Sequence, residues 1–290
     1  MEYRFLGKTG VQVSILTLGT MTFGKEADES KSIKIMKKAL DTGLNSFDTA
    51  NIYTGGKSEE IVGRFIQPFR DTIFLASKVH FPTSDRINDR RSSRRHIFLS
   101  VEESLKRLRT DRLDLLYLHH WDDCTSLDES LAAIETLIQH GKVIYAGVSN
   151  FSAWQSIKAL WIADRLNLRP IVAVQPMYNL LKRQVEVEIL PMAKAAGLGV
   201  LVYSPQAGGM LTGKYLDGAT GRLTTNEMYK RRYGDPLYET VVSKFCEYAK
   251  SKGLMPSALA LAWTYSHPDV TSSIVGARSL EQFTQSLSCL

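Results

Sequence analysis

A carboxylic acid, a phenol, an amine and an imidazole follow successive apolar segments of this chain. They are Asp48, Tyr53, Lys78 and His120. Each lies at or just beyond the end of a strand-like run, and a fold of parallel strands collects such ends on one face. The four groups would then converge on a single pocket. Such a set suits carbonyl reduction by hydride, which needs a proton donor, a group that lowers its pKa and a group that orients the carbonyl.

Each of these residues also has a plain structural interpretation. Asp48 could cap a helix, Tyr53 could be a surface aromatic residue, and Lys78 could face solvent at a strand end. The adjacent His119 and His120 could be structural residues of a barrel. Their order along the chain favours the functional interpretation, because the residues follow the second, third and fourth strand-like runs in turn.

Apolar, strand-like runs alternate with amphipathic stretches along the chain. The predicted strands are residues 16–20, 46–49, 73–78, 113–119, 143–149, 171–176, 200–204 and 273–275. Between them, apolar residues recur at helical spacing, for example at Ile97, Val101, Leu105 and Leu108. Runs such as 113–118 are apolar on both faces, which is typical of buried parallel strands.

Eight strand-then-helix units predict a fold of the α/β class, a single (β/α)₈ TIM barrel. Residues 1–290 would form one domain, with an N-terminal β-hairpin over residues 1–15. A doubly wound open sheet is the alternative, weakened by the lack of a Gly-x-Gly-x-x-Gly turn after the first strand. Residues 214–236 form one long irregular stretch. We interpret it as a cofactor lid, with a disordered surface loop as the alternative, because connections of this length are often functional or disordered.

Composition narrows the class of protein. The chain is 44% hydrophobic and 23% charged, which is typical of a soluble globular protein. No run reaches about 18 apolar residues and the N-terminus lacks an apolar signal core, so neither a membrane span nor a leader is expected. The three cysteines have no metal-binding spacing and indicate reduced thiols in the cytoplasm. The net charge of +6 fits either a slightly basic solvated surface or attraction for an anionic ligand. No basic run carries the aromatics typical of nucleic-acid binding.

Several segments, in order along nearly the whole chain, resemble the aldo-keto reductase superfamily. They are Phe-Asp-Thr-Ala-Asn-Ile-Tyr at 47–53, Ser-Glu-Glu-Ile-Val-Gly at 58–63, Ser-Lys at 77–78, Leu-Asp-Leu-Leu-Tyr-Leu-His-His-Trp at 113–121, Gly-Lys-Val-Ile-Tyr-Ala-Gly-Val-Ser-Asn-Phe at 141–151, Val-Gln-Pro-Met-Tyr-Asn at 174–179 and Tyr-Ser-Pro-Gln-Ala-Gly-Gly at 203–209. The last of these, with the Leu-Thr-Gly-Lys-Tyr that follows, is similar to the bacterial and channel-β-subunit-like branches.

The resemblance implies a catalytic role for each of the four residues. Tyr53 would be the general acid, and the Lys78 ammonium would lower the phenol's pKa. Asp48 would hold Lys78 charged and oriented. Of the two adjacent histidines, His120 is our choice for binding the substrate carbonyl, because it precedes Trp121 as the family's histidine precedes a tryptophan.

The resemblance also implies a cofactor site for NADPH/NADP⁺. Ser149, Asn150 and Gln175 would bind the nicotinamide amide, Tyr203 would stack on its ring, and Thr20 and Met21 would contact the ribose. The pyrophosphate would lie on the turn Ser204, Pro205, Gln206, Ala207 and Gly208. Gly276, Arg278 and Gln282 match the family's segment for the adenosine phosphate, and Arg278 suits a 2′-phosphate because guanidinium binds phosphate as a fork. Lys214 would act from the lid.

The expected function is therefore reduction of small aldehydes or ketones to alcohols with NADPH, without a metal, a nucleic acid or a membrane as partner. Two other interpretations remain. The chain could be a nucleotide-sensing regulatory subunit that binds NADPH with negligible turnover. It could also be a phosphate-handling barrel enzyme of another chemistry, which would not bind nicotinamide.

Overall fold

The computed structural model describes residues 1–290 and contains a closed barrel of parallel strands. The barrel strands are β3 (Leu16–Gly19), β4 (Ser46–Asp48), β5 (Phe74–Val79), β6 (Leu113–Leu118), β7 (Val143–Ser149), β8 (Ile171–Gln175), β9 (Gly199–Val202) and β10 (Ser272–Val275). They follow one another in chain order, and β10 pairs with β3 to close the ring. This confirms the predicted (β/α)₈ barrel, and each predicted strand matches one of these eight to within two residues at its ends.

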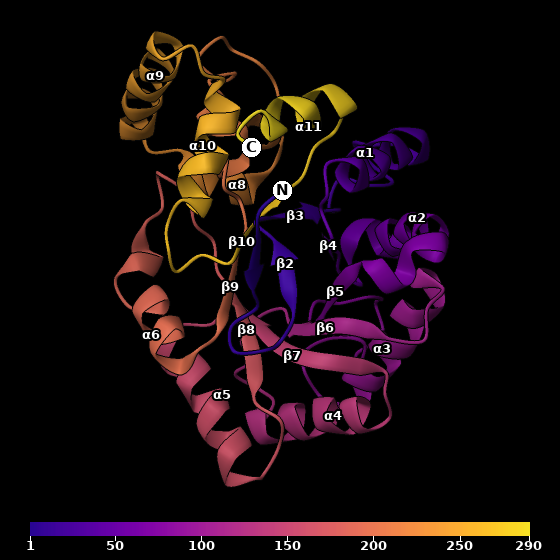
Figure 1. Ribbon diagram of the computed structural model, residues 1–290. Coiled ribbons are helices and arrows are strands. Elements are labelled where there is room, and N and C mark those ends of the chain that lie inside the picture. The colour runs from indigo at the N-terminus through magenta and orange to yellow at the C-terminus, as the bar shows by residue number, and fades with distance from the viewer.

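Helices surround the barrel and cover its outer face (Figure 1). They are α1 (Glu29–Asp41), α2 (Lys57–Ile66), α3 (Arg94–Leu108), α4 (Leu127–Gln139), α5 (Ala153–Arg165), α6 (Ile189–Ala196), α7 (Arg222–Thr225), α8 (Glu227–Tyr233), α9 (Pro236–Ser251), α10 (Pro256–Tyr265) and α11 (Leu280–Leu287). Local signals define several of their starts. Ser152, for example, forms a capping box with Gln155 at the start of α5. None of the helices is both long and apolar enough to cross a membrane.

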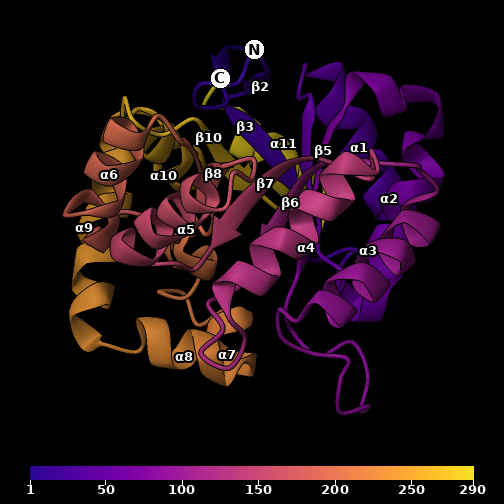
Figure 2. The same cartoon turned by 90° about the horizontal axis from the view of Figure 1, so that it is seen from below.

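The predicted N-terminal hairpin is present and lies against one end of the barrel. Strands β1 (Tyr3–Phe5) and β2 (Gln12–Ser14) pair antiparallel, with Arg4 opposite Val13. Leu6 and Val13 are fully buried among side chains inside the barrel, such as Leu115 and Tyr117. Figure 2 shows both chain ends at this end of the molecule, with α7 and α8 at the opposite end. The hairpin therefore closes the amino-terminal end of the barrel and leaves the other end available for a site.

Residues 214–236 are not one irregular stretch, as the sequence suggested. They contain α7 and α8, and α9 begins at Pro236. The Asn226 side chain accepts from the backbone N–H groups of Met228 and Tyr229 and so starts α8. Tyr229 and Tyr233, four residues apart, are buried in an apolar cluster with residues such as Leu211 and Cys246. The helix escapes sequence analysis because it is short and its other residues are mostly charged, so its helical periodicity is weak.

Candidate active site

A cavity of about 640 Å³ lies at the carboxyl ends of the barrel strands. Its lining includes residues that follow nearly every strand, among them Thr20, Tyr53, His119, Asn150 and Gly276. Successive residues of a strand point to opposite faces, so one residue at each strand end faces the barrel axis. The same alternation that points Phe74 and Ala76 of β5 into the barrel brings Lys78 to the floor of this cavity.

Asp48, Lys78 and Tyr53 form one hydrogen-bonded chain beneath the cavity. Lys78 Nζ donates to the Asp48 carboxylate in a close ion pair, to the backbone oxygen of Thr49 at 2.7 Å, and to Tyr53 Oη at 3.3 Å. Gln175 Nε2 donates to the other carboxylate oxygen of Asp48 at 2.8 Å. The Lys78 side chain is fully buried, so these polar partners replace water around the two charges.

Burial and charge act in opposite directions on the Tyr53 phenol. Burial raises the pKa of Tyr53 and the Lys78 ammonium lowers it, and the net result lies above the usual value of 10.0. We expected the lysine to dominate, but removal of the phenolate from water outweighs it here. Burial alone would also lower the pKa of Lys78, but the charges of Asp48 and Tyr53 outweigh it and raise that pKa. Lys78 is therefore a stable cation and Tyr53 a protonated donor.

The backbone around Tyr53 is held in an uncommon conformation. Tyr53 lies in a short 3₁₀ turn after β4, where Thr54 has φ 53° and Gly55 has φ 61°. A threonine in the left-handed region is strained, and such strain concentrates at functional sites. The next residue, Gly56, packs its backbone against the Arg107 side chain, where a Cβ would meet Arg107 Cδ at 2.8 Å. The turn therefore fixes the position from which the phenol reaches Lys78.

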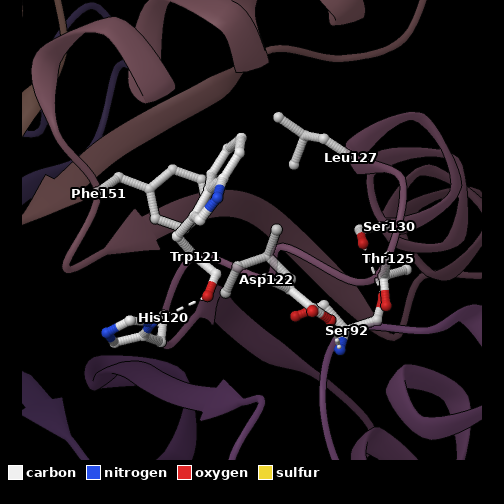
Figure 3. A pocket seen from close by; sticks show the side chains of 9 residues that line it. Ser92, His120, Trp121, Asp122, Thr125, Leu127, Ser130 and Phe151 are labelled. Carbon is white, nitrogen blue, oxygen red and sulfur yellow. Dashed lines mark hydrogen bonds between the residues drawn. The ribbon is translucent and has the colours of Figure 1, made fainter.

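The two histidines take different places. The rings of His119 and Tyr53 lie edge to face with centroids 6.1 Å apart, and the His119 Nδ1 makes no hydrogen bond. His120 is exposed, and its Nδ1 donates to the backbone oxygen of Trp121 at 2.8 Å (Figure 3). Its aromatic neighbours are His80 at 5.6 Å and Phe81 at 6.0 Å, measured between ring centroids. Both histidines line the cavity, but the one beside the Asp48–Lys78–Tyr53 chain is His119.

His119 is a neutral imidazole. Burial and the nearby Lys78 charge hold its pKa well below the usual value of 6.5. Its Nδ1 is buried without a hydrogen-bond partner, which is a costly state unless a ligand or water completes it. The ring is positioned through its backbone, because Asn150 Nδ2 donates to the His119 carbonyl at 2.9 Å.

Amide and aromatic groups from the next three strands extend the site. Ser149 and Gln175 are buried neighbours at the ends of β7 and β8, where Ser149 Oγ donates to the Gln175 carbonyl at 3.0 Å. Tyr203 Oη donates to Asn150 Oδ1 at 2.6 Å. Asn150 has φ 58°, and Ser204, just after β9, has φ 57°. Two non-glycine residues in the left-handed region at the ends of strands are a second sign of a functional site.

Three cations gather at the far end of the cavity. Lys214, Arg222 and Arg278 all line it, and none of them pairs with a carboxylate. Burial lowers the pKa of Lys214, and the charges of Arg278 and Arg222 lower it further. Three positive charges this close together repel one another, and a bound anion would relieve this repulsion. This end of the cavity therefore favours an anionic ligand. Ser257 Oγ also lines the cavity and is buried without a partner.

The structure brings together nearly all of the predicted site residues. Asp48, Tyr53 and His120 line the cavity and Lys78 lies directly beneath it. The predicted cofactor residues that line it are Thr20, Met21, Ser149, Asn150, Gln175, Tyr203, Ser204, Pro205, Gln206, Gly208, Lys214, Gly276, Arg278 and Gln282. Ala207 does not, because it is fully buried in the cluster below the turn.

Sequence analysis assigned no individual role in the site to several lining residues, among them Phe81, Arg222, Tyr229 and Arg232. Phe81 follows β5 closely, so its place after a strand end was an available signal. The other three lie in α7 and α8, which the sequence did not reveal. No group of three or more metal-binding side chains is arranged to hold a metal ion.

Comparison with known proteins points to one family. The model of the aldo/keto reductase family matches residues 15–290. An uncharacterized oxidoreductase of Bacillus subtilis, YrpG, is 40% identical over 99% of this chain and 90% of its own length. A probable voltage-gated potassium channel subunit beta of Arabidopsis thaliana is 37% identical over 99% of this chain and 90% of its length. The Escherichia coli protein tas is 32% identical over 100% of this chain and 93% of its length.

Proposed function

We propose, since the chain belongs to the aldo/keto reductase family, that it is an NADPH-dependent enzyme that reduces aldehydes or ketones to alcohols. The observation that carries this proposal is the hydrogen-bonded chain from Asp48 through Lys78 to Tyr53, which ends at the wall of the cavity. A buried phenol next to a buried ammonium suits a general acid. The free thiols of all three cysteines agree with a cytoplasmic protein.

The residues of the cavity fit a nicotinamide cofactor with an adenosine phosphate. One end offers three cations without acidic partners and the unpaired Ser257 hydroxyl, which suits phosphates. The other end offers the Asn150 and Gln175 amides and the Tyr203 ring, which suit a flat ring that carries an amide. When bound, NADPH supplies the hydride.

The remaining steps belong to side chains of this protein. Tyr53 holds a proton at Oη and donates it to the carbonyl oxygen as charge develops there. Lys78 Nζ lies 3.3 Å from Tyr53 Oη and stabilises the phenolate that is left. Asp48 and Thr49 fix the position of the ammonium. The neutral His119 imidazole, rather than His120, donates a hydrogen bond to the same carbonyl oxygen in this proposal and orients it.

Turnover distinguishes this proposal from the main alternative. The similarity to channel β subunits favours a nucleotide-sensing subunit as the second candidate. Purified protein should oxidise NADPH steadily when an activated aldehyde such as 4-nitrobenzaldehyde is added, which a purely sensing subunit would not do. Binding of NADPH without multiple turnovers would favour the regulatory role, and no binding of any nicotinamide would reject both.

The two histidines can be told apart by matched substitutions. His119→Ala should lower kcat/KM for the aldehyde by about tenfold or more, because it removes a hydrogen bond to the reacting oxygen. His120→Ala should have a smaller effect, because that ring is exposed and bonds to its own chain at Trp121. Steady-state kinetics of both variants decides, and a larger loss for His120→Ala would assign the carbonyl contact to His120 instead.

Cofactor preference should depend on Arg278. Arg278→Ala should weaken binding of NADPH by about tenfold or more while NADH binding changes little, because only NADPH carries the 2′-phosphate that a guanidinium can bind. Fluorescence titration with the two cofactors measures this, and added salt should narrow the difference between them. Equal losses for both cofactors would show that Arg278 does not recognise the 2′-phosphate.

Residues 214–236 should act as a lid over the bound cofactor. They contribute Lys214, Arg222 and Tyr229 to the cavity wall and follow closely on the turn at Gly208. Binding of NADPH should therefore slow proteolytic cleavage within the segment, because the phosphates would pair with its cations. Limited proteolysis followed by mass spectrometry measures the rate. Cleavage at the same rate with saturating NADPH would contradict the lid.

A further inference from the structure

One cation of the cavity, Arg232, has no role in the proposed reaction. It lies on α8 between two buried anchors, because Tyr229 precedes it by three residues and Tyr233 follows it directly. Tyr233 Oη accepts from Asn179 Nδ2 at 3.0 Å, which ties α8 to the barrel. Gly208 has φ 67°, and a Cβ there would meet the Tyr229 ring at 2.6 Å, so the ring packs on the turn itself. These anchors hold the Arg232 guanidinium over the cavity, which it lines.

Arg232 lies at the reacting end of the cavity. Its guanidinium carbon is 5.9 Å from the centroid of the Tyr229 ring. Burial raises the pKa of the Tyr203 phenol, and the Arg232 charge beside that phenol lowers it in part. Burial and the charges of Lys78 and Asp48 have the largest effects on the pKa of Tyr53, and the Tyr229 phenol raises this pKa further. Tyr53, Tyr203 and Tyr229 all line the same cavity as Arg232, so the guanidinium shares this cavity with the three phenols.

No carboxylate of the protein neutralises this guanidinium. Of the acidic residues of its segment, Glu227 pairs with Lys230 at 2.7 Å, and Asp235 caps α9 by accepting from Leu237 N at 3.0 Å. Arg222 also approaches the Tyr229 ring, but its Nη1 donates to Tyr229 Oη at 3.4 Å and its charge acts on Lys214. Arg222 thus acts on Lys214, whereas Arg232 acts on the Tyr203 phenol. Arg232 is a separate, unpaired cation.

We propose that Arg232 binds a carboxylate of the substrate, so that the preferred substrates are aldehydes or ketones that also carry a carboxylate. This rests on the proposed reductase function. A guanidinium that lies beside an aromatic ring can bind a planar carboxylate through two parallel hydrogen bonds. At this end the Lys78 ammonium is already paired with Asp48, so Arg232 is the cation left for a single negative charge of a ligand. The apolar groups that also line the cavity, Met21, Ile52 and Phe81, would contact the body of such a substrate.

The test compares a carboxylate with its neutral ester. The substrates are 4-carboxybenzaldehyde and methyl 4-formylbenzoate, which share the same ring and aldehyde. The wild-type protein should prefer the acid, and Arg232→Met should lower the ratio of the two kcat/KM values by about tenfold, as expected for one charge-assisted hydrogen-bonding pair. Arg232→Lys should restore part of the ratio, because it returns the charge without the fork.

The neighbouring Arg231 provides the matched control. It is exposed and does not line the cavity, so Arg231→Met removes the same charge from the protein without touching the site. A fall in the ratio of equal size in Arg231→Met would show a general charge effect and overturn the assignment. An unchanged ratio in Arg232→Met would overturn it as well.

A binding measurement separates this inference from the proposed function. Calorimetric titration of 4-(hydroxymethyl)benzoate into protein with NADPH reports the carboxylate site without any turnover, because neither ligand can accept a hydride. Arg232→Met should weaken this binding by about tenfold relative to wild type and Arg231→Met. Absence of aldehyde reduction with Arg232-dependent binding would reject the reductase function and uphold the carboxylate site. Reduction with binding that does not depend on Arg232 would do the reverse.

Discussion

Tyr53→Phe should lower kcat for aldehyde reduction by about 10²- to 10⁴-fold, the usual contribution of a positioned proton donor. The phenol acts on the transition state, since it donates as the carbonyl oxygen gains charge, whereas the cofactor contacts other residues. The dissociation constant of NADPH should therefore stay within about threefold of the wild-type value, a change of well under ~1.4 kcal/mol. Single-turnover kinetics and fluorescence titration measure the two quantities separately.

The phenylalanine variant retains the ring that packs against His119 and Lys78, so the control for a packing effect is built into the substitution. Its free energy of unfolding should change little, because the lost hydroxyl makes one 3.3 Å contact with Lys78, which keeps its bonds to Asp48 and Thr49. If the variant retains about a tenth of the wild-type rate while binding NADPH normally, Tyr53 is not the general acid.

Lys78→Met should lower kcat by about 10²-fold or more and move the alkaline limb of the pH profile to higher pH. Reduction needs Tyr53 protonated, so the rate falls as the pH rises through the pKa of the phenol. Burial already raises that pKa and the Lys78 ammonium lowers it in part. Removing the ammonium therefore raises the pKa further. A pH profile that keeps its alkaline limb in place would contradict this role of Lys78.

The same substitution should also destabilise the fold, and a second variant separates the two effects. Lys78→Met leaves the Asp48 carboxylate buried without its cation, which costs about 3–5 kcal/mol in comparable buried pairs. In the double variant Lys78→Met/Asp48→Asn no charge remains, so much of the stability should return while the rate stays low. Urea unfolding measures the first quantity and steady-state kinetics the second.

The shifted pKa of Lys78 predicts the pH range over which its ion pair with Asp48 stabilises the folded protein. The folded-state pKa of Lys78 is raised above its usual 10.5, so the ion pair stabilises the protein fully at neutral pH. That contribution is lost only as the pH rises through the raised pKa. The stability difference between wild type and Lys78→Met should therefore stay constant from neutral pH to about pH 10 and shrink above it. A difference that shrinks near neutral pH would show another origin.

The sequence alone determined the barrel and most of its site. Apolar runs of strand length that alternate with helical patterns leave few other topologies, and parallel strands place their carboxyl ends together. Asp48 and Lys78 each lie at or one residue before the last residue of a strand. Chain order along β4 and β5, which are adjacent and parallel, is thus enough to bring them together.

Tertiary structure decided what chain order could not. In β6, Leu115 and Tyr117 face the barrel interior, so the two-residue period also turns His119 inward, whereas His120 lies exposed at the wall of the cavity. The sequence could not show this, because β6 is apolar on both faces and either set could have been the inner one. Burial around Tyr53 likewise sets the sign of its pKa shift, and that burial comes from elements far apart in the chain. The position of Arg232 depends in the same way on the packing of Tyr229 and Tyr233, which local periodicity in so short a helix does not reveal.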